Sequence, residues 1–278
     1  MIVSPFTPLF FINRKTDGIE SEYIQTFSTT DRILLQLIES SGTLWMGSAK
    51  VMNAEDDSIL YDIVFNVWAV NRNVRLLFTE IILSPGYYYV DLGALGKSCI
   101  FQVTDNTAIL EKTTLIQYSM HNNRQREDAI FFIDGMQYFF DFRVPGGFKD
   151  SNYTFGVESE QFVTDTADII QLFALDSIQK KFTLGTSQGC PVWYAELLNR
   201  LLCCTYVYFD GVRYARKESS VPELNIQLEG VNSFVFTQNL QRVNNINPVI
   251  ENTNQALIRR IDNSMYRTIN NINNRLIN

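Results

Sequence analysis

The chain has 278 residues, of which 46% are hydrophobic and 19% charged, and it carries 20 Phe, 13 Tyr and a formal net charge of −7. This composition excludes an intrinsically disordered chain, and it favours strands, because aromatic and β-branched side chains suit a pleated surface. The acidic balance argues against general nucleic-acid recognition, which needs a surplus of Lys and Arg. Pro5 and Pro8 interrupt the short apolar run at the N-terminus, so we expect neither a signal peptide nor a membrane span there.

The first 146 residues contain short apolar or alternating runs separated by turn residues, among them "RILLQLIE", "YDIVFNVWAV", "VRLLFTEIIL" and "MQYFFDFRV". Runs spaced by roughly 10 to 15 residues are typical of an antiparallel sandwich or barrel. The acidic Glu55-Asp56-Asp57 segment lacks the alternating ligands and the glycine of a calcium loop, so we interpret it as a solvated turn. Residues 1–146 are therefore predicted to form an N-terminal β-rich domain.

Two Asp-Gly pairs, Asp134-Gly135 and Asp210-Gly211, each separate two strand-like runs. Asp-Gly supplies the positive φ angles of a type I′ turn, so each pair predicts a β-hairpin. The two segments share a pattern of apolar and polar positions, which an internal duplication or simple convergence would both explain.

The segment 143–152, "RVPGGFKDSN", has the densest turn chemistry in the chain and predicts a domain boundary. A second β-rich domain is expected over 147–247, with strands at "YTFGVES", "DIIQLFAL", "KKFTLG" and "SFVFTQNLQ". It should include one helix at about 191–204, because Pro191 suits a first helical position. The apolar face of this helix consists of Trp193, Leu197, Leu198, Leu201 and Leu202.

The last segment, 248–278, is rich in Asn and has apolar residues every three or four positions, which predicts a C-terminal helix. Asn is a poor helix former, so this helix should need a surface to dock on, either its own domain or a neighbouring subunit. The possible subunit interface is the stripe Leu257, Ile261, Met265, Ile269, Ile272 and Leu276. The predicted fold is thus mainly β (α+β), with two tandem antiparallel sandwich-like or barrel-like domains, the second with a flanking helix, and a helical tail.

The pattern Gly185-Thr186-Ser187-Gln188-Gly189 matches the G-x-S-x-G motif of a catalytic serine. That motif needs a helix starting at the serine and a general base, yet Pro191 delays the helix and no His follows His121. Lys180 and Lys181 are close in sequence but look like exposed strand ends. We therefore interpret Ser187 as a turn residue.

Cys190 precedes the predicted helix, where a thiol can acquire a lowered pKa, with His121 as a conceivable partner. The simpler interpretation is a packed Cys190 and a surface His121 in a polar loop. Cys99, Cys190, Cys203 and Cys204 form no C-x-x-C pair, which indicates reduced thiols and no zinc site. With no phosphate-binding or dinucleotide motif either, we expect no metal, no cofactor and no enzyme activity.

Several segments together resemble a known group of proteins: "RVPGGF" at 143–148, "FGVESEQF" at 155–162, "FTLGTSQGCPVWYAELLNRLLCC" at 182–204, "RYAR" at 213–216 and "SVPE" at 220–223. In order and spacing they are similar to tail or baseplate structural proteins of tailed bacteriophages and prophages of gut anaerobes, including the crAss-like group. The resemblance covers most of the chain up to about residue 240. The tail after Pro248 is outside it.

This resemblance implies a virion structural subunit of the tail, baseplate or connector region, assembled in the host cytoplasm as a multi-copy ring or hub. Its partners would be copies of itself and other tail or connector proteins, with no nucleic-acid recognition and no membrane. An alternative is a carbohydrate- or receptor-binding β-sandwich, in which Tyr88 of "GYYYVDL" could offer an exposed ring or could belong to the core. A wall-degrading hydrolase acting through Ser187 or Cys190 is a third alternative.

Overall fold

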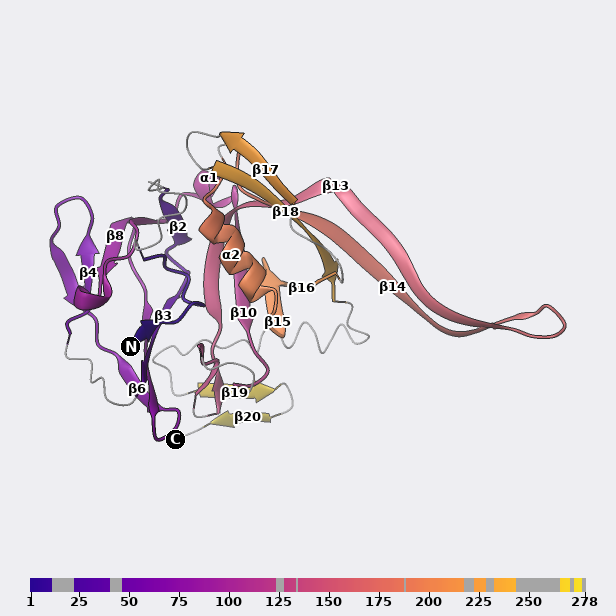
Figure 1. Cartoon of the computed structure of the whole chain (residues 1–278), viewed down its shortest axis with the longest axis horizontal. Coiled ribbons are helices and arrows are strands. Elements are labelled where there is room, and N and C mark those ends of the chain that lie inside the picture. Colours follow the sequence, from indigo (N-terminus) through magenta and orange to yellow (C-terminus); the bar gives the residue numbers. More distant parts are fainter. Residues whose placement is uncertain are drawn as a thin grey trace.

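A computed structural model describes residues 1–11, 23–40, 47–123, 128–133, 135–187, 189–217, 223–228, 233–243, 266–270 and 273–276. The chain folds into a body of packed sheets, and a long two-stranded hairpin projects from one side of that body (Figure 1). The expected mainly β fold is confirmed.

The body contains three sheets, and the strands of each follow in their spatial order. The five-stranded sheet consists of β2 (Gln25–Ser28), β9 (Phe101–Thr104), β8 (Gly86–Asp91), β4 (Lys50–Asn53) and β5 (Ile59–Asp62). The four-stranded sheet consists of β1 (Ile2–Val3), β3 (Ile33–Ser40), β7 (Val74–Ile81) and β6 (Asn66–Ala69). The seven-stranded sheet consists of β14 (Ile169–Leu184), β13 (Phe140–Val163), β10 (Thr113–Ser119), β15 (Tyr206–Phe209), β16 (Val212–Arg216), β18 (Ser233–Arg242) and β17 (Glu223–Leu228).

Smaller elements complete the described part of the chain. Two further hairpins are β11 (Phe132–Ile133) with β12 (Met136–Gln137), and β19 (Tyr266–Asn270) with β20 (Asn273–Leu276). The helices are α1 (Thr107–Leu110), α2 (Val192–Leu201) and a 3-10 turn at Gly93–Leu95. The described strand pairings are antiparallel except that β2 runs parallel to β9.

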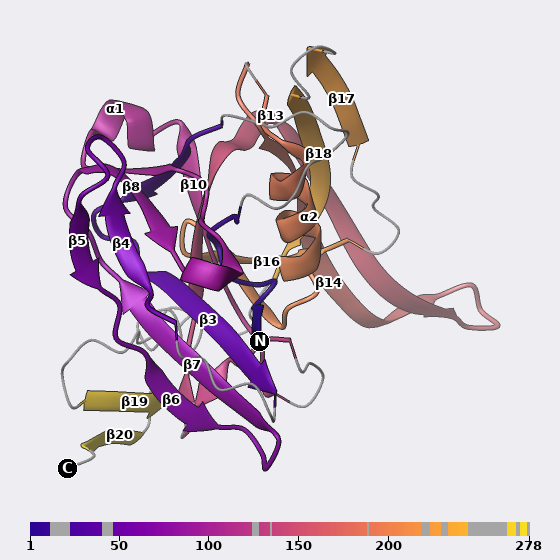
Figure 2. The same cartoon turned by 60° about the vertical axis from the view of Figure 1, so that its left-hand side comes forward.

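The four-stranded sheet is the middle layer of the body, and its central strands β3 and β7 contribute side chains to the cores on both of its faces. Along β3, Leu34 packs into the core facing the seven-stranded sheet, whereas Leu35 and Leu37 pack into the core facing the five-stranded sheet. Figure 2 shows β3 and β7 between these two sides. Alternate side chains of a strand point to opposite faces, so the continuous apolar run "ILLQLI" is what a doubly covered strand requires.

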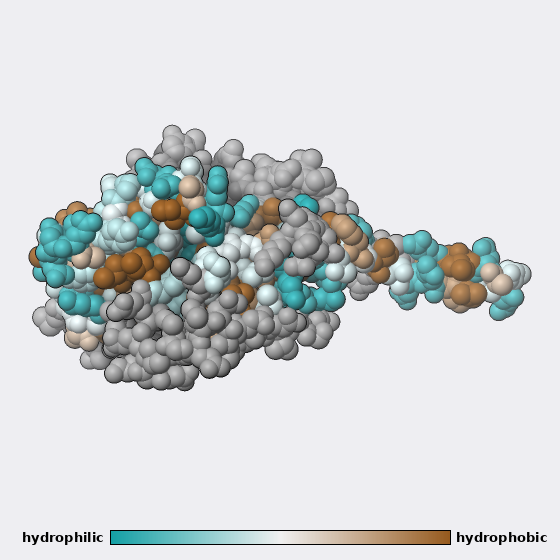
Figure 3. Space-filling view, turned by 90° about the horizontal axis from the view of Figure 1, so that it is seen from above, coloured by the Kyte–Doolittle hydropathy of each residue, from teal (hydrophilic) through white to brown (hydrophobic). Residues whose placement is uncertain are grey.

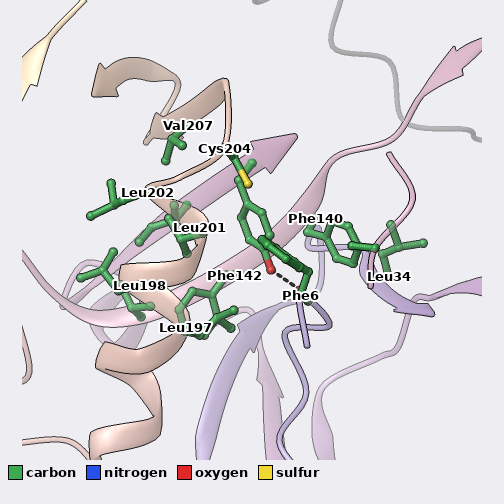
Figure 4. Packing of buried hydrophobic residues seen from close by; sticks show 14 of the residues in the cluster. Phe6, Leu34, Phe140, Phe142, Leu197, Leu198, Leu201, Leu202, Cys204 and Val207 are labelled. Carbon is green, nitrogen blue, oxygen red and sulfur yellow. Dashed lines mark hydrogen bonds between the residues drawn. The ribbon is translucent and has the colours of Figure 1, made fainter. Parts of the chain in front are cut away.

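Helix α2 packs its predicted apolar face into the core on the seven-stranded side of the middle sheet, which we call the larger core. Trp193, Leu197, Leu198 and Leu201 are buried, and Figure 4 shows the leucines next to Phe142 of β13. The helix begins one residue later than expected, because Pro191 is its N-cap in an extended conformation. This helix is therefore held by burial of its apolar face against the seven-stranded sheet.

Asp210-Gly211 lies in a hairpin, as predicted, and so does Gly135 of the other pair, whose Asp134 lies outside the described residues. Gly135 connects β11 to β12 with a φ of 77°. Asp210 and Gly211 connect β15 to β16 with φ values of 47° and 81°, the positive pair that a type I′ turn needs.

The boundary expected between residues 146 and 147 falls inside the continuous strand β13. Strand β10 from the first half of the chain pairs with residues 140–145 of β13 on one side and with β15 of the second half on the other. Phe142 of β13 also stacks on Tyr194, which belongs to α2, with ring centroids 5.5 Å apart. The bidentate ion pair between Arg143 of β13 and Asp31, with Nε–Oδ2 and Nη2–Oδ1 distances of 2.6 and 2.9 Å, lies within the first half. Strand pairing and packing therefore both cross the expected boundary.

In the described part of 248–278, the structure has two strands in place of the expected C-terminal helix. Residues 266–270 and 273–276 form the antiparallel hairpin β19–β20, in which Tyr266 pairs with Leu276. The helical spacing is misleading because Asn, which dominates the segment, has low helix propensity and favours turns. Leu257, Ile261, Met265 and Ile272 lie outside the described residues, while Ile269 and Leu276 are on the two strands.

Candidate functional site

The G-x-S-x-G segment is a turn, as its sequence predicts. Thr186 and Gly189 form an isolated antiparallel bridge around it, and the amide of Gly189 donates to the carbonyl of Thr186 at 2.9 Å. Helix α2 begins only at Val192, so the helix does not start at Ser187 as the hydrolase motif requires.

Cys190 and His121 have environments that suit packing and solvation. Cys190 is fully buried, and burial raises the pKa of its thiol to about 12, the opposite of the shift that an activated nucleophile needs. Its backbone is bridged to Phe234. His121 is exposed, and its Nδ1 lies 3.3 Å from the hydroxyl of Tyr206.

The aromatic and acidic candidates are also accounted for. Tyr88 is buried in the core between the five-stranded and four-stranded sheets, so its ring is not an exposed stacking surface. The segment Glu55-Asp56-Asp57 is an exposed turn between β4 and β5. Among the described residues, no group of three His, Cys, Asp or Glu side chains is arranged to hold a metal ion.

The most distinctive feature of the molecule is the projecting hairpin, which we call the arm and define as residues 154–178. Its strands are the outer parts of β13 and β14, paired from Thr154 with Gln179 to Val163 with Ile169. Ten residues of strand span about 33 Å. Figures 1 and 2 both show the arm extending away from the body.

The base of the arm is fixed where β13 changes its partner strand. β13 pairs with β10 up to Pro145 and with β14 from Gly146 onwards. Pro145 has no N–H, and its carbonyl accepts a hydrogen bond from the amide of Gly185 at 2.9 Å. Gly146 has a φ of 109°, which a residue with a side chain rarely adopts. The turn chemistry at 143–152 therefore redirects a strand.

The base also has support on its other side. Strand β14 pairs with β18 over residues 179–184, so that this part of β14 lies between two strands. Phe182 is fully buried there, and the centroid of its ring lies 5.2 Å from that of Phe148 and 4.9 Å from that of Phe209. In the described part of the chain, the segment of β14 that precedes residue 179 has only β13 as a partner.

The arm exposes apolar side chains on both of its faces. Directly paired residues share a face, so Val163 and Ile169 lie on one face and Phe162 and Ile170 on the other. Among the arm side chains whose exposure the structure describes, the large apolar ones that are exposed are Phe155, Val157, Phe162, Val163, Ile169, Ile170 and Leu172. The most exposed of them is Phe155, at 75%. Figure 3 shows brown patches along the arm between hydrophilic ones.

The tip of the arm is a compact turn. The amide of Thr164 donates to the carbonyl of Asp168 at 2.8 Å, and the hydroxyl of Thr164 accepts from the amide of Asp168 at 3.0 Å. Ala167 has a φ of 62° and donates its amide to the carbonyl of Thr164. The two strands are thus closed by a specific turn.

The charge of the arm has one sign. Residues 154–178 contain five carboxylates and no Lys or Arg. These carboxylates are Glu158, Glu160, Asp165, Asp168 and Asp176. The arm therefore presents apolar groups together with negative charge.

A scan of the chain against protein-family models finds no match, and a comparison with curated proteins finds none either. No helix in the described ranges is long and apolar enough to cross a bilayer.

Proposed function

We propose that this protein is a structural subunit of a multi-copy assembly, in the tail, baseplate or connector region of a tailed bacteriophage. We further propose that the arm is its principal joint, by which we mean its main contact with neighbouring subunits. The observation that carries this proposal is the arm itself, a two-stranded projection with apolar residues exposed on both faces.

The stability of the arm supports this proposal. A two-stranded hairpin is marginal in water unless a further strand, sheet or helix covers it. The distal arm has apolar side chains but no second layer of the described chain to bury them against. Exposed apolar groups gathered on one element mark an interaction surface. A neighbouring molecule that covers the arm would supply the missing layer.

The position of the arm supports a joint between subunits. Its base is continuous with the seven-stranded sheet and is packed into the larger core. A force applied to the arm is therefore transmitted to the body. A rigid body with a projecting strand pair can bind a neighbour by adding strands to an exposed edge. The sequence resemblance to phage tail and baseplate proteins agrees with this role.

The carbohydrate-binding alternative has lost the residue on which it was based, because Tyr88 is buried. Ser187 lies in a turn, and burial raises the pKa of Cys190, so neither has the environment that a hydrolase requires. We therefore propose no enzyme activity.

The test compares the full chain with a variant whose arm is shortened. In the variant, Thr154 and Gln179, which pair across the hairpin, are joined by Asn-Gly, and residues 155–178 are removed. Asn-Gly favours the type I′ turn that closes a two-residue hairpin. Both proteins are measured by size exclusion with light scattering.

We expect the full chain to form a discrete oligomer, visible as rings or closed particles by electron microscopy, and the shortened chain to remain a monomer. Unfolding curves of the two proteins should show that the body is intact in both. A full chain that stays at 32.0 kDa at every concentration tested, or a shortened chain that assembles equally well, would contradict the proposal.

A further inference from the structure

A second exposed apolar surface lies around β6, on the body. Val64 is 81% exposed and Val67 is 62% exposed. Both are apolar residues in a segment that is itself rich in apolar residues, so burial would be the usual outcome. β6 pairs with β7 along one edge, and no other described strand pairs with its second edge. We call this surface the β6 edge and define it by Val64, Val67, Arg72 and Arg75. An open edge offers backbone donors and acceptors to an incoming strand.

The charge of the β6 edge is opposite to that of the arm. Residues 63–79 contain Arg72 and Arg75 and no Asp or Glu, although Asp62 and Glu80 flank this range and Glu39 of β3 pairs in register with Arg75. The arm has five carboxylates and no basic residue. Both arginines are exposed, and neither forms an ion pair within the described part of the chain. Complementary charge orients two surfaces and raises their rate of association.

The arm cannot reach the β6 edge of its own molecule. Figures 1 and 2 both place β6 on the side of the body away from the arm, whose tip points outwards. A contact between the two surfaces therefore has to join two copies of the chain.

We propose that the arm of one copy docks along the β6 edge of the next copy. This inference rests on the proposed function, and it adds the partner surface to the arm. Apolar residues of the arm cover Val64 and Val67, while the acidic positions of the arm face Arg72 and Arg75. The two surfaces differ, so the interface is heterologous and repeats from copy to copy until a ring closes.

A heterologous interface makes a specific prediction for mixtures of variants. The first variant has the shortened arm and keeps an intact β6 edge. The second is Val67→Asp with Arg72→Glu, which keeps the arm but places negative charge on the β6 edge. Alone, each variant lacks one half of every joint. Mixed, the arm of the second variant can dock on the first variant once, and growth stops there.

The expected result is that each variant alone is monomeric and that the equimolar mixture gives a single 1:1 complex of about twice 32.0 kDa by light scattering. The wild-type chain should assemble fully under the same conditions. A control variant, Ile82→Asp with Lys112→Glu, makes the same changes at an exposed apolar residue and an exposed lysine elsewhere on the body, and it should assemble as the wild type does.

Two further variants guard against misfolding. Phe162→Ser with Ile170→Ser replaces the shortened arm, and Val64→Asp with Arg72→Glu replaces the first β6-edge variant. Each should give the same mixing result, and unfolding curves should match the wild type because all four positions are exposed.

The failures of the two proposals are distinguishable. If the β6-edge variants assemble like the wild type, or if two monomeric variants give no complex when mixed, the arm docks elsewhere and this inference is wrong. If the second variant alone forms dimers through its intact arm, the joint is between arms and the inference is also wrong. If the arm variants assemble like the wild type, the proposed function itself fails.

Discussion

Replacement of Gly146 by Ala tests how the body holds the arm. Gly146 has a φ of 109°, and a Cβ at this position would overlap the carbonyl oxygen of Thr183 and lie 3.1 Å from the amide of Gly185. Ordinary van der Waals contact begins at 3.4 Å, so the backbones of β13 and β14 would have to separate at the base of the arm.

The magnitude follows from three contributions. A residue with a Cβ at positive φ costs about 1–2 kcal/mol. Forced overpacking costs about 1–3 kcal/mol. The hydrogen bond from the amide of Gly146 to the carbonyl of Lys112 is 3.1 Å long, and weakening it costs up to about 1 kcal/mol. We expect a total loss of about 2–6 kcal/mol in the free energy of unfolding.

Gly211 provides the matched control. It also has a positive φ, of 81°, but a Cβ there would meet nothing within 4 Å. Gly211→Ala should therefore cost only the conformational part, about 1–2 kcal/mol. Urea unfolding of both variants measures the difference. If the two losses are equal, the close approach of β13 to β14 at Gly146 does not exist as described.

Two other predictions concern the body. Asp31→Ala leaves the guanidinium of Arg143 almost buried without its carboxylate, so the free energy of unfolding should fall by about 3–5 kcal/mol in urea; a loss under about 1 kcal/mol would show that the pair is solvated. At pH 8, a thiol reagent should label Cys203 rapidly, because that residue is exposed. It should label Cys190 and Cys99 only slowly, because burial raises the pKa of the Cys190 thiol to about 12 and that of the Cys99 thiol to about 11. Rapid labelling of all the thiols in the native protein, or fast labelling that survives Cys203→Ser, would contradict the packing.

The local patterns that the sequence predicts correctly are those whose physical cause lies within a few residues. Asp210-Gly211 forms its hairpin because both residues adopt positive φ. Helix α2 forms because apolar residues at helical spacing follow a proline that is suited to the helix start. Ser187 lies in a turn because Thr186 and Gly189 are bridged around it and Pro191 delays the start of the helix.

The arm and the crossing of the expected boundary depend on which strands pair, and no local pattern specifies that. The dense turn residues at 143–152 predict a break, but Pro145 and Gly146 instead allow β13 to leave β10 and join β14. The runs on either side of 164–168 are recognisable as strands in the sequence. Their exposure is not predictable, because the same alternation of apolar and polar residues would fit a strand packed on a core.

The C-terminal segment shows the opposite error, in which a periodic pattern does not decide the structure. Apolar residues spaced by three or four positions predict a helix only where the intervening residues tolerate one, and in this segment Asn is the commonest of them. Tyr266 and Leu276 are paired across a hairpin instead.

Electron microscopy of the assembled full chain tests the central claim most directly. We predict particles in which the arm of each copy lies against the body of the next, with the β6 edge covered and the arm's apolar residues buried. Particles whose arms extend into solvent while other surfaces join the bodies, or single molecules of 32.0 kDa, would contradict this claim.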